Sequence, residues 1–302
     1  MDLLSEILNQ AAWKNDLLVK RTLSQNWGYS FPCERSGGFH TITQGSCYAR
    51  TDKELIKLER GDVLFIIKGV HHDLVSSPKE KVISIKDINS LKNGKKSESL
   101  KGATENITSF VSIRYEVPEG SNHPFFMELP SIIHVKATDI PFGHPIHTTI
   151  QMISHEMESS VGSDLILQRL TDILLYNTIR RWLENNQYPK SGWIGVFKDE
   201  KVVAVLEIIH KDPLTNWTIE SLAKSVGLSR ASLAFRFKKS LDMTINDYIV
   251  KLKLDKGKTL IHDFDISLEE VSRRVGYSSA FAFSKAYKRI YGQSPRKRKI
   301  LS

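Results

Sequence analysis

The N-terminal half of the chain is a series of short apolar or alternating runs separated by turn residues. Gly37-Gly38 and Gly45 indicate turns, and the polar segment Lys86–Glu105 is predicted to be a loop. Runs of this length and spacing are typical of a β-sandwich or a small β-barrel. The predicted strands are Phe39–Ile42, Ser46–Ala49, Leu55–Leu58, Val63–Ile67, Leu74–Ser76, Ile107–Tyr115 and Ile132–Val135.

After about Pro145 the apolar period changes from that of strands to that of helices. Helices are predicted over Ile146–Met157 and Asp164–Glu184, and Ser163 is a candidate N-cap of the second. The apolar stripe of this second helix is too wide for one packing partner. The helix is therefore either buried within its own domain or packed against both that domain and a second subunit. The stripe consists of Leu165, Ile166, Leu167, Leu170, Ile173, Leu174, Leu175, Ile179 and Trp182.

The stretch from Glu184 to Gly192 is polar, contains Pro and Gly, and is the best candidate for a linker. A chain of 302 residues is long enough for two domains that each bury a core. We therefore predict an α+β protein of two domains. Residues 1–190 would form a β-sandwich or small β-barrel with a helical extension from about residue 146, and residues 191–302 would form an all-α domain.

Within the second domain one helical unit occurs twice, at an offset of 49 residues. Thr218–Ser229 reads TIESLAKSVGLS and Ser267–Ser278 reads SLEEVSRRVGYS. Each begins with a hydroxyl residue that can cap a helix, and each helix ends at a glycine, where positive φ is favoured. The serine that ends each stretch is expected to cap the next helix. The pattern predicts helix-turn-helix units at about 218–241 and 267–291, and the alternative is an ordinary helical bundle.

The second helix of each unit has two different faces. Leu233 and Phe237, and likewise Phe283 and Tyr287, are spaced to point into a core. A recognition helix uses its outward residues on DNA, where apolar side chains suit thymine methyl groups and Lys285 offers a donor. The candidate DNA-binding residues are Arg230, Ala231, Ser232, Ala234, Phe235, Lys238, Ser279, Phe281, Ser284, Lys285 and Lys288.

A single long helix, from Thr244 to about Ile261, is predicted to connect the two units. Gly257 lies in its middle, where glycine costs up to about 1 kcal/mol relative to alanine. This position indicates that another helix packs closely against the connecting helix.

The net charge of +9 is concentrated in the repeat-containing third of the chain. From His210 onward there are 19 Lys and Arg against 9 Asp and Glu, a net charge of +10, so the remainder carries −1. A basic domain joined to a nearly neutral one indicates a polyanion-binding module attached to a domain of another kind. The alternative is a basic surface that serves only solubility.

The cysteine content and the lengths of the apolar runs indicate the cellular compartment. Two cysteines, Cys33 and Cys47, are too few for a disulfide framework and fit a reducing environment. No apolar run approaches the roughly 18 residues of a transmembrane helix, and the first residues lack the basic region of a signal peptide. We expect a cytoplasmic protein that does not associate with membranes.

These residues resemble the AraC/XylS family of bacterial transcription regulators. The resemblance is carried by the unit WTIESLAKSVGLSRASLAFRFKKSL, the connector DYIVKLKLDKGKTLI and the closing motif VGYSSAFAFSKAYKRIYGQSP. The N-terminal half is similar to the cupin-type sensor domain of one branch of that family, through GGFHTITQGSCYA, GDVLFIIKGVHHDL and HPFFMELPSIIHV. The resemblance implies that the N-terminal domain is a cupin-like β-barrel with a helical extension, which binds an effector and dimerises. It also implies an all-α, AraC-type DNA-binding domain with two helix-turn-helix motifs.

The resemblance also allows a test for a metal-dependent cupin enzyme. Such cupins carry a His-x-His pair with a Glu, and a further His after a glycine- and proline-containing pattern. Here Gly61, Gly69 and His72 match the second pattern, with Ile67 in place of the proline, but Ile42 replaces the second His of the first pattern after His40. We therefore expect no catalytic metal, no cofactor and no enzymatic activity. The residues His40, Cys47, His71 and His72 are candidates for an effector pocket, the alternative being ordinary structural roles.

The function that the resemblance implies is sequence-specific control of transcription. The expected partners are double-stranded promoter DNA, RNA polymerase, a small-molecule effector, and a second copy of the chain bound through the helix at 164–184. Activation is the usual outcome in the family. The alternatives are a cupin oxygenase or isomerase with a helical appendage, and a non-specific nucleic-acid binder.

Overall fold

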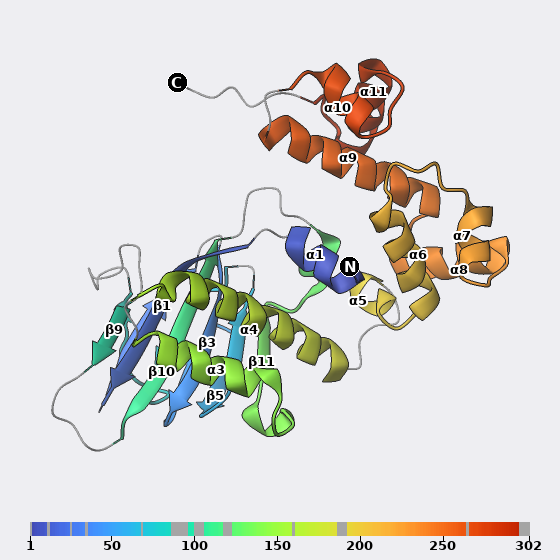
Figure 1. Ribbon diagram of the computed structural model, residues 1–302. Helices are drawn as coiled ribbons and strands as arrows, with labels where there is room; N and C mark the ends of the chain where they lie inside the picture. The colour runs from blue at the N-terminus through green and yellow to red at the C-terminus, as the bar shows by residue number, and fades with distance from the viewer. Residues whose placement is uncertain are drawn as a thin grey trace. The chain divides into compact units, whose positions relative to one another are not determined.

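The computed structural model in Figure 1 describes residues 2–10, 13–24, 26–33, 36–67, 69–85, 96–99, 106–116, 123–158, 161–185, 192–263 and 266–295. The chain divides into two compact units. One unit comprises Ile7–Gln187, and the other comprises Tyr188–Ser302 together with Met1–Glu6. Helix α1 (Leu3–Gln10) contains the position at which the chain passes from one unit to the other.

The unit of Ile7–Gln187 is built on two sheets. The six-stranded sheet has the order β11-β6-β3-β10-β1-β9, and the five-stranded sheet has the order β5-β4-β7-β2-β8. Neighbouring strands are antiparallel except for β1–β9 and β2–β8, which are parallel. The bounds are β1 (Lys14–Leu23), β2 (Gly28–Phe31), β3 (Ser36–Gln44), β4 (Ser46–Arg50), β5 (Leu55–Glu59), β6 (Val63–Ile66), β7 (His72–Val75), β8 (Ile83–Ser84), β9 (Lys96–Ser99), β10 (Thr108–Glu116) and β11 (Ile132–Val135).

The two sheets correct the prediction of a barrel. Strands β11 and β9 end one sheet and β5 and β8 end the other, so the described strands do not form one closed ring of hydrogen bonds. The sequence also gave no indication of β1 and β2. Within the predicted loop of 86–105, residues Lys96–Ser99 form β9, and the rest of that segment lies outside the described residues.

The core between the sheets follows from the alternation of side chains along the strands. On β3, Ile42 belongs to the cluster between the sheets, whereas Phe39 stacks on Phe65 and contacts Tyr115 on the other face, with ring centroids 4.2 Å and 5.9 Å apart. The inter-sheet cluster consists of Leu23, Trp27, Phe31, Ile42, Cys47, Ala49, Leu58, Leu64, Ile66, Leu74 and Phe110.

Helices cover the outer face of the six-stranded sheet (Figure 1). Both predicted helices are confirmed, as α3 (Pro145–Glu156) and α4 (Ser163–Asn185), and they follow α2 (Pro124–Glu128) and the 3₁₀ turn η1 (Ala137–Asp139). The wide apolar stripe of α4 divides into two groups. Its buried members are Leu167, Leu170, Leu174, Leu175 and Ile179, and its exposed members are Leu165, Ile166 and Ile173.

The other unit is helical. Its helices are α5 (Gly192–Val196), α6 (Glu200–Lys211), α7 (Ile219–Ser225), α8 (Arg230–Leu241), α9 (Ile245–Asp263), α10 (Leu268–Arg274) and α11 (Ala280–Tyr291). Helix α9 is the predicted connector, and its first half packs Tyr248 against Phe237 of α8, with ring centroids 5.7 Å apart. Its second half contributes Leu254 and Ile261 to a core with α10 and α11. In the parts of the chain that the structure describes, no helix has the length and apolarity needed to cross a bilayer.

Candidate nucleic-acid interface and the interior of the sheet unit

The first helix-turn-helix unit is fixed by local hydrogen bonds. Thr218 Oγ1 accepts the backbone N–H of Ser221 at 3.1 Å, and Ser221 Oγ accepts that of Thr218 at 3.2 Å, so a capping box begins α7. Gly227, at φ +70°, makes the turn. Ser229 then caps α8 by accepting from the Ser232 N–H at 3.2 Å, as predicted.

The second unit repeats this arrangement with one difference. Ser267 caps α10 by accepting the Glu270 N–H at 3.2 Å, and Gly276 turns the chain at φ +76°. The next helix is capped by Ser279, which accepts the Ala282 N–H at 3.1 Å, and not by Ser278 as predicted. The second turn is one residue longer, so the offset between the copies grows from 49 to 50 residues, and α11 begins at Ala280.

The inward faces of α8 and α11 hold the predicted core residues. Leu233, Phe237 and Phe283 are completely buried, and Tyr287 is almost so. The Phe283 ring lies between Tyr277 and Tyr287, with centroid distances of 5.6 Å and 5.7 Å. Burying these large side chains fixes which face of each helix points outward.

The outward faces carry the candidate DNA-binding residues. Phe235 and Phe281 are 68% and 79% exposed, which is unusual for large apolar side chains. The other exposed members are Arg230, Ala231, Lys238, Ser279, Lys285 and Lys288, and the half-buried members are Ser232, Ala234 and Ser284. The outward faces of α8 and α11 therefore both combine cationic groups with apolar ones.

Three carboxylates that the sequence did not single out contact arginines near these faces. Arg230 Nη1 lies 2.7 Å from Oε1 of Glu220 on α7, and Arg236 Nη1 lies 3.0 Å from Asp199 Oδ2. Glu270 pairs with Arg273 and Arg274, which hold the pKa of its carboxyl below the usual value. For Lys238, Lys285 and Lys288 the structure gives no ion pair within the residues it describes.

In the sheet unit, two of the candidate pocket residues meet between the sheets. The Nε2 atoms of His40 on β3 and His72 on β7 are 2.8 Å apart. His72 Nδ1 lies 2.9 Å from the carbonyl oxygen of Val70, which can only accept, so Nδ1 carries the proton. In the neutral pair, His40 Nε2 donates to His72 Nε2, and His40 Nδ1 accepts from Ser112 Oγ at 2.8 Å. Because one of the two facing Nε2 atoms must accept, the bond excludes the state in which both imidazoles are protonated.

The surroundings of the histidine pair favour the neutral forms. Burial lowers the pKa of His72 to about 4 and holds that of His40 well below its usual value, with the charges of His72 and Arg21 adding to the effect on His40. Phe31 stacks on the His72 ring at 5.1 Å. Arg21, which is 1% exposed, has its guanidinium 5.4 Å from the centre of the Tyr29 ring. The interior is therefore a polar, aromatic-lined centre in an apolar core.

The other two candidate pocket residues lie elsewhere. Cys47 belongs to the apolar inter-sheet cluster, and burial raises the pKa of its thiol to about 12. His71 is exposed and hydrogen-bonded to Ser30 Oγ at 2.9 Å. Because neighbouring residues of an extended strand point to opposite faces, His71 is directed away from the interior that His72 enters. The effector pocket therefore remains a prediction, for which His40, Cys47 and His72 lie in the interior and His71 lies at the surface.

A metal ion of the cupin type does not fit these donors. No group of three His, Cys, Asp or Glu side chains suited to hold a metal occurs among the described residues. The two interior imidazoles are hydrogen-bonded to each other, and the lone pair on His40 Nδ1 is taken by Ser112. The described residues therefore do not provide the donor set of a cupin-type metal centre.

Comparison with known proteins decides the family. Residues 2–184 match the model of a cupin family, and residues 222–299 match that of a helix-turn-helix domain. A putative AraC-like transcription regulator of Streptomyces lividans is 25% identical over 98% of this chain and 97% of its own. The chain belongs to the AraC/XylS family of transcriptional regulators.

Two further proteins are similar to most of the chain. The transcriptional regulator AlkR of Acinetobacter baylyi is 26% identical over 98% of this chain and 98% of its own. Among solved structures, unsaturated fatty acid bound ToxT of Vibrio cholerae matches 93% of both chains with 11% identity and a TM-score of 0.36. The protein is thus a DNA-binding transcriptional regulator with a cupin-type N-terminal domain, and it is not an enzyme.

Proposed function

We propose that this regulator recognises specific promoter sequences through the outward faces of α8 and α11. The observation that carries the proposal is that both helices are capped by serine, bury one aromatic face and expose a second face that combines apolar and cationic side chains. Such helices enter the major groove with their N-terminal, outward residues. The contact set is Arg230, Ala231, Ser232, Ala234, Phe235, Lys238, Ser279, Phe281, Ser284, Lys285 and Lys288.

The side chains of this set divide by chemistry. Ala231, Ala234, Phe235 and Phe281 can make only apolar contacts, which suit thymine methyl groups. Lys285 and the arginine and lysine residues beside it can donate to base edges or phosphates. Ser279 accepts a helix N–H with its oxygen, which leaves its hydroxyl proton for a phosphate.

Fluorescence anisotropy with labelled DNA tests sequence-specific recognition. A fragment from upstream of a neighbouring gene should bind about 10³-fold or more tightly than a shuffled fragment of the same composition. Affinity for both should fall steeply with salt, because Lys and Arg displace counterions from phosphates. Equal affinity for the two fragments would show a non-specific binder instead.

We further propose that the protein activates transcription in the cytoplasm by acting with RNA polymerase. Activation is what the AraC/XylS resemblance implies as the usual outcome. Transcription from the bound promoter by purified RNA polymerase tests this step, since an activator raises the amount of transcript and a repressor lowers it. If the protein binds the promoter but lowers transcription, the DNA-binding proposal stands and the protein is a repressor.

Control by a small-molecule effector is proposed for the cupin-type domain. Its interior offers His40, His72 and Cys47 beside the aromatic ring of Phe31. An effector would act by a shift of population, because it can favour only the arrangement to which it binds more tightly. We expect the affinity for promoter DNA to change when a small molecule that binds this domain is added. If no such molecule changes the promoter affinity, the proposal is contradicted.

We propose that the chain forms a homodimer through α4. Leu165, Ile166 and Ile173 are 62%, 46% and 43% exposed. Ile166 and Ile173 are seven residues apart and lie on one side of the helix, and Leu165 lies about 100° away from Ile166. Their exposure in the single chain supports a partner surface, because exposed apolar stripes of this kind are covered in assemblies.

A further inference from the structure

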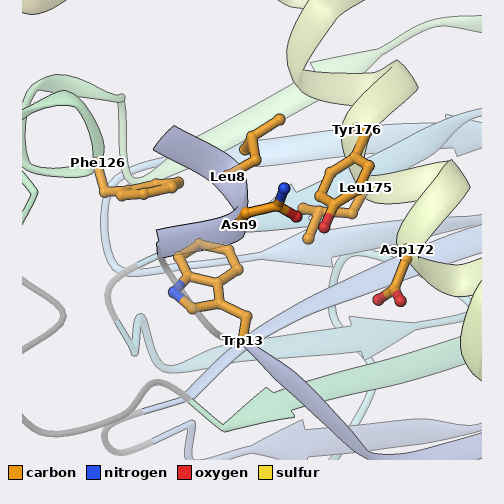
Figure 2. A pocket seen from close by; sticks show the side chains of 7 residues that line it. All are labelled: Leu8, Asn9, Trp13, Phe126, Asp172, Leu175 and Tyr176. Atoms are coloured by element: carbon orange, nitrogen blue, oxygen red, sulfur yellow. The ribbon is translucent and has the colours of Figure 1, made fainter. Parts of the chain in front are cut away.

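A hollow opens on the helical side of the six-stranded sheet, away from the histidine pair. It encloses about 390 Å³, part of which is open to solvent. Figure 2 shows its walls: Leu8 and Asn9 of α1, Trp13 before β1, and Leu175 and Tyr176 of α4, with Phe126 of α2 at one side.

Aromatic rings form much of this hollow. The centroids of Trp13 and Phe126 are 5.0 Å apart at an angle of 37°, and Trp13 also contacts Phe65 and Tyr115. Tyr176 projects from α4 on the other side (Figure 2). The Trp13 indole is therefore held in place by neighbouring rings, and its position does not depend on a ligand.

A single carboxylate, that of Asp172, lines the hollow. Asp172 lies one turn before Tyr176 on α4, so the two side chains share a face, and Figure 2 shows both directed toward the space beside Trp13. The Asp172 side chain is only 24% exposed. Burial raises its pKa, and burial together with the charge of Asp172 raises the pKa of Tyr176. The hollow is thus an electronegative place in which a cation would be stabilised.

The cation that the protein itself supplies is a weak match for this carboxylate. Arg169 Nη1 lies 3.8 Å from Asp172 Oδ2, and the arginine side chain is 70% exposed. A long contact with a solvated guanidinium contributes little. Asp172 can therefore accept a second, closer cation from the side of the hollow.

The lining selects the kind of cation. A hard metal ion requires six or more oxygen ligands, and the hollow offers one carboxylate, one amide and one phenol. An anion would be repelled by Asp172. Aromatic faces attract organic cations and also cover their carbon skeletons.

We propose that this hollow binds a small organic ammonium ion, with its charge beside Asp172 and its carbon skeleton against Trp13 and Tyr176. The site is distinct from the interior of the two sheets. It requires neither DNA binding nor an effect on transcription, so it stands or falls separately from the proposed function.

Three probes with the same aromatic body and different charge test the site. Isothermal titration calorimetry of the full chain would compare 2-phenylethylammonium, uncharged 2-phenylethanol and anionic phenylacetate. The ammonium ion should bind about tenfold more tightly than the alcohol, and phenylacetate should bind more weakly than either. Equal binding of the three probes, or no binding of the ammonium ion at millimolar concentration, would overturn the proposal.

Variants assign the effect to the hollow. Asp172→Asn keeps the shape of the side chain and should abolish the preference for the cation over the alcohol. The matched control Asp164→Asn removes an exposed carboxylate from the first turn of the same helix and should leave that preference unchanged. Tyr176→Leu should weaken binding of the ammonium ion more than binding of the alcohol, since the cation loses contact with an aromatic face. A preference that survives Asp172→Asn, in protein whose thermal unfolding is unchanged, would refute the assignment.

Discussion

Gly257 is the position where the packing of the DNA-binding unit can be tested most directly. It lies in the middle of α9 with no conformational need for glycine, because its φ is that of an ordinary helix. A Cβ atom added there would lie 2.7 Å from Cε2 and 2.9 Å from Cζ of Phe283. Carbon atoms in contact prefer 3.5–4.0 Å, so Gly257→Ala requires the ring to move by about 1 Å.

The two effects of Gly257→Ala oppose each other. Alanine favours the helix by about 1 kcal/mol. Phe283 is completely buried between Tyr277 and Tyr287, so the ring cannot retreat, and overpacking of this kind costs about 1–3 kcal/mol or more. We expect the clash to exceed the gain and the free energy of unfolding of this unit to fall by about 1–2 kcal/mol, which lowers its Tm by roughly 5–10 °C.

Calorimetry of the full-length chain measures this change, and a double-mutant cycle identifies its cause. Phe283→Leu removes the opposing ring atoms, so Gly257→Ala should become less damaging in its presence, with a coupling energy of about 1 kcal/mol or more. Thr259→Ala, at an exposed position of the same helix, should change stability by no more than about 0.5 kcal/mol. If Gly257→Ala instead stabilised the protein by about 1 kcal/mol, the close approach of α11 to α9 would be refuted.

Three further predictions follow from the described contacts. Lys285→Ala should relax discrimination at one base pair by about 1–3 kcal/mol in anisotropy titrations of single-base promoter variants, whereas a uniform loss across all variants would identify a phosphate contact. The pKa of His72 is lowered from 6.5 to about 4 in the folded chain, so its contribution is fully present above pH 6.5 and is lost as the pH falls toward 4. Between pH 7 and 5, urea denaturation should show a loss of about 2 kcal/mol for this group, with His40 adding in the same direction, and a flat profile would contradict the neutral pair. Ile173→Asp should convert a dimer to a monomer in sedimentation velocity while Gln168→Asp, on another side of α4, leaves it dimeric; a wild-type monomer would contradict the dimer.

The helix-turn-helix units could be predicted from sequence because their determinants are local. Thr218 and Ser267 cap their helices through bonds to residues three positions away, and the turns at Gly227 and Gly276 require only a positive φ. The core positions follow from the helical period. The one local error, Ser278 for Ser279, arose because the cap was placed at the 49-residue offset of the first helices, although the core pairs Leu233–Phe237 and Phe283–Tyr287 are already 50 residues apart.

In the candidate site, the sequence determined which residue types were present and on which helical face, whereas folding decided their partners. Glu220 meets Arg230 across the turn between α7 and α8, and Asp199 reaches Arg236 from 37 residues away. Neither ion pair joins residues at a regular helical or strand spacing, so neither could be inferred from the sequence of one chain. The outward set of α8 and α11 remains a prediction for which binding experiments are the test.

In the sheet unit, the sequence by itself determined that short strands precede two helices and that a cupin-type metal set is incomplete at Ile42. Only the tertiary structure decided that the strands form two sheets, that β1 lies between β10 and β9, and that His40 and His72 share a hydrogen bond between the sheets. The physical reason is the distance along the sequence over which each interaction acts. A cap or a turn is fixed by neighbours a few residues away, but strand pairing and a bond between residues 32 positions apart depend on how the whole unit closes around its core.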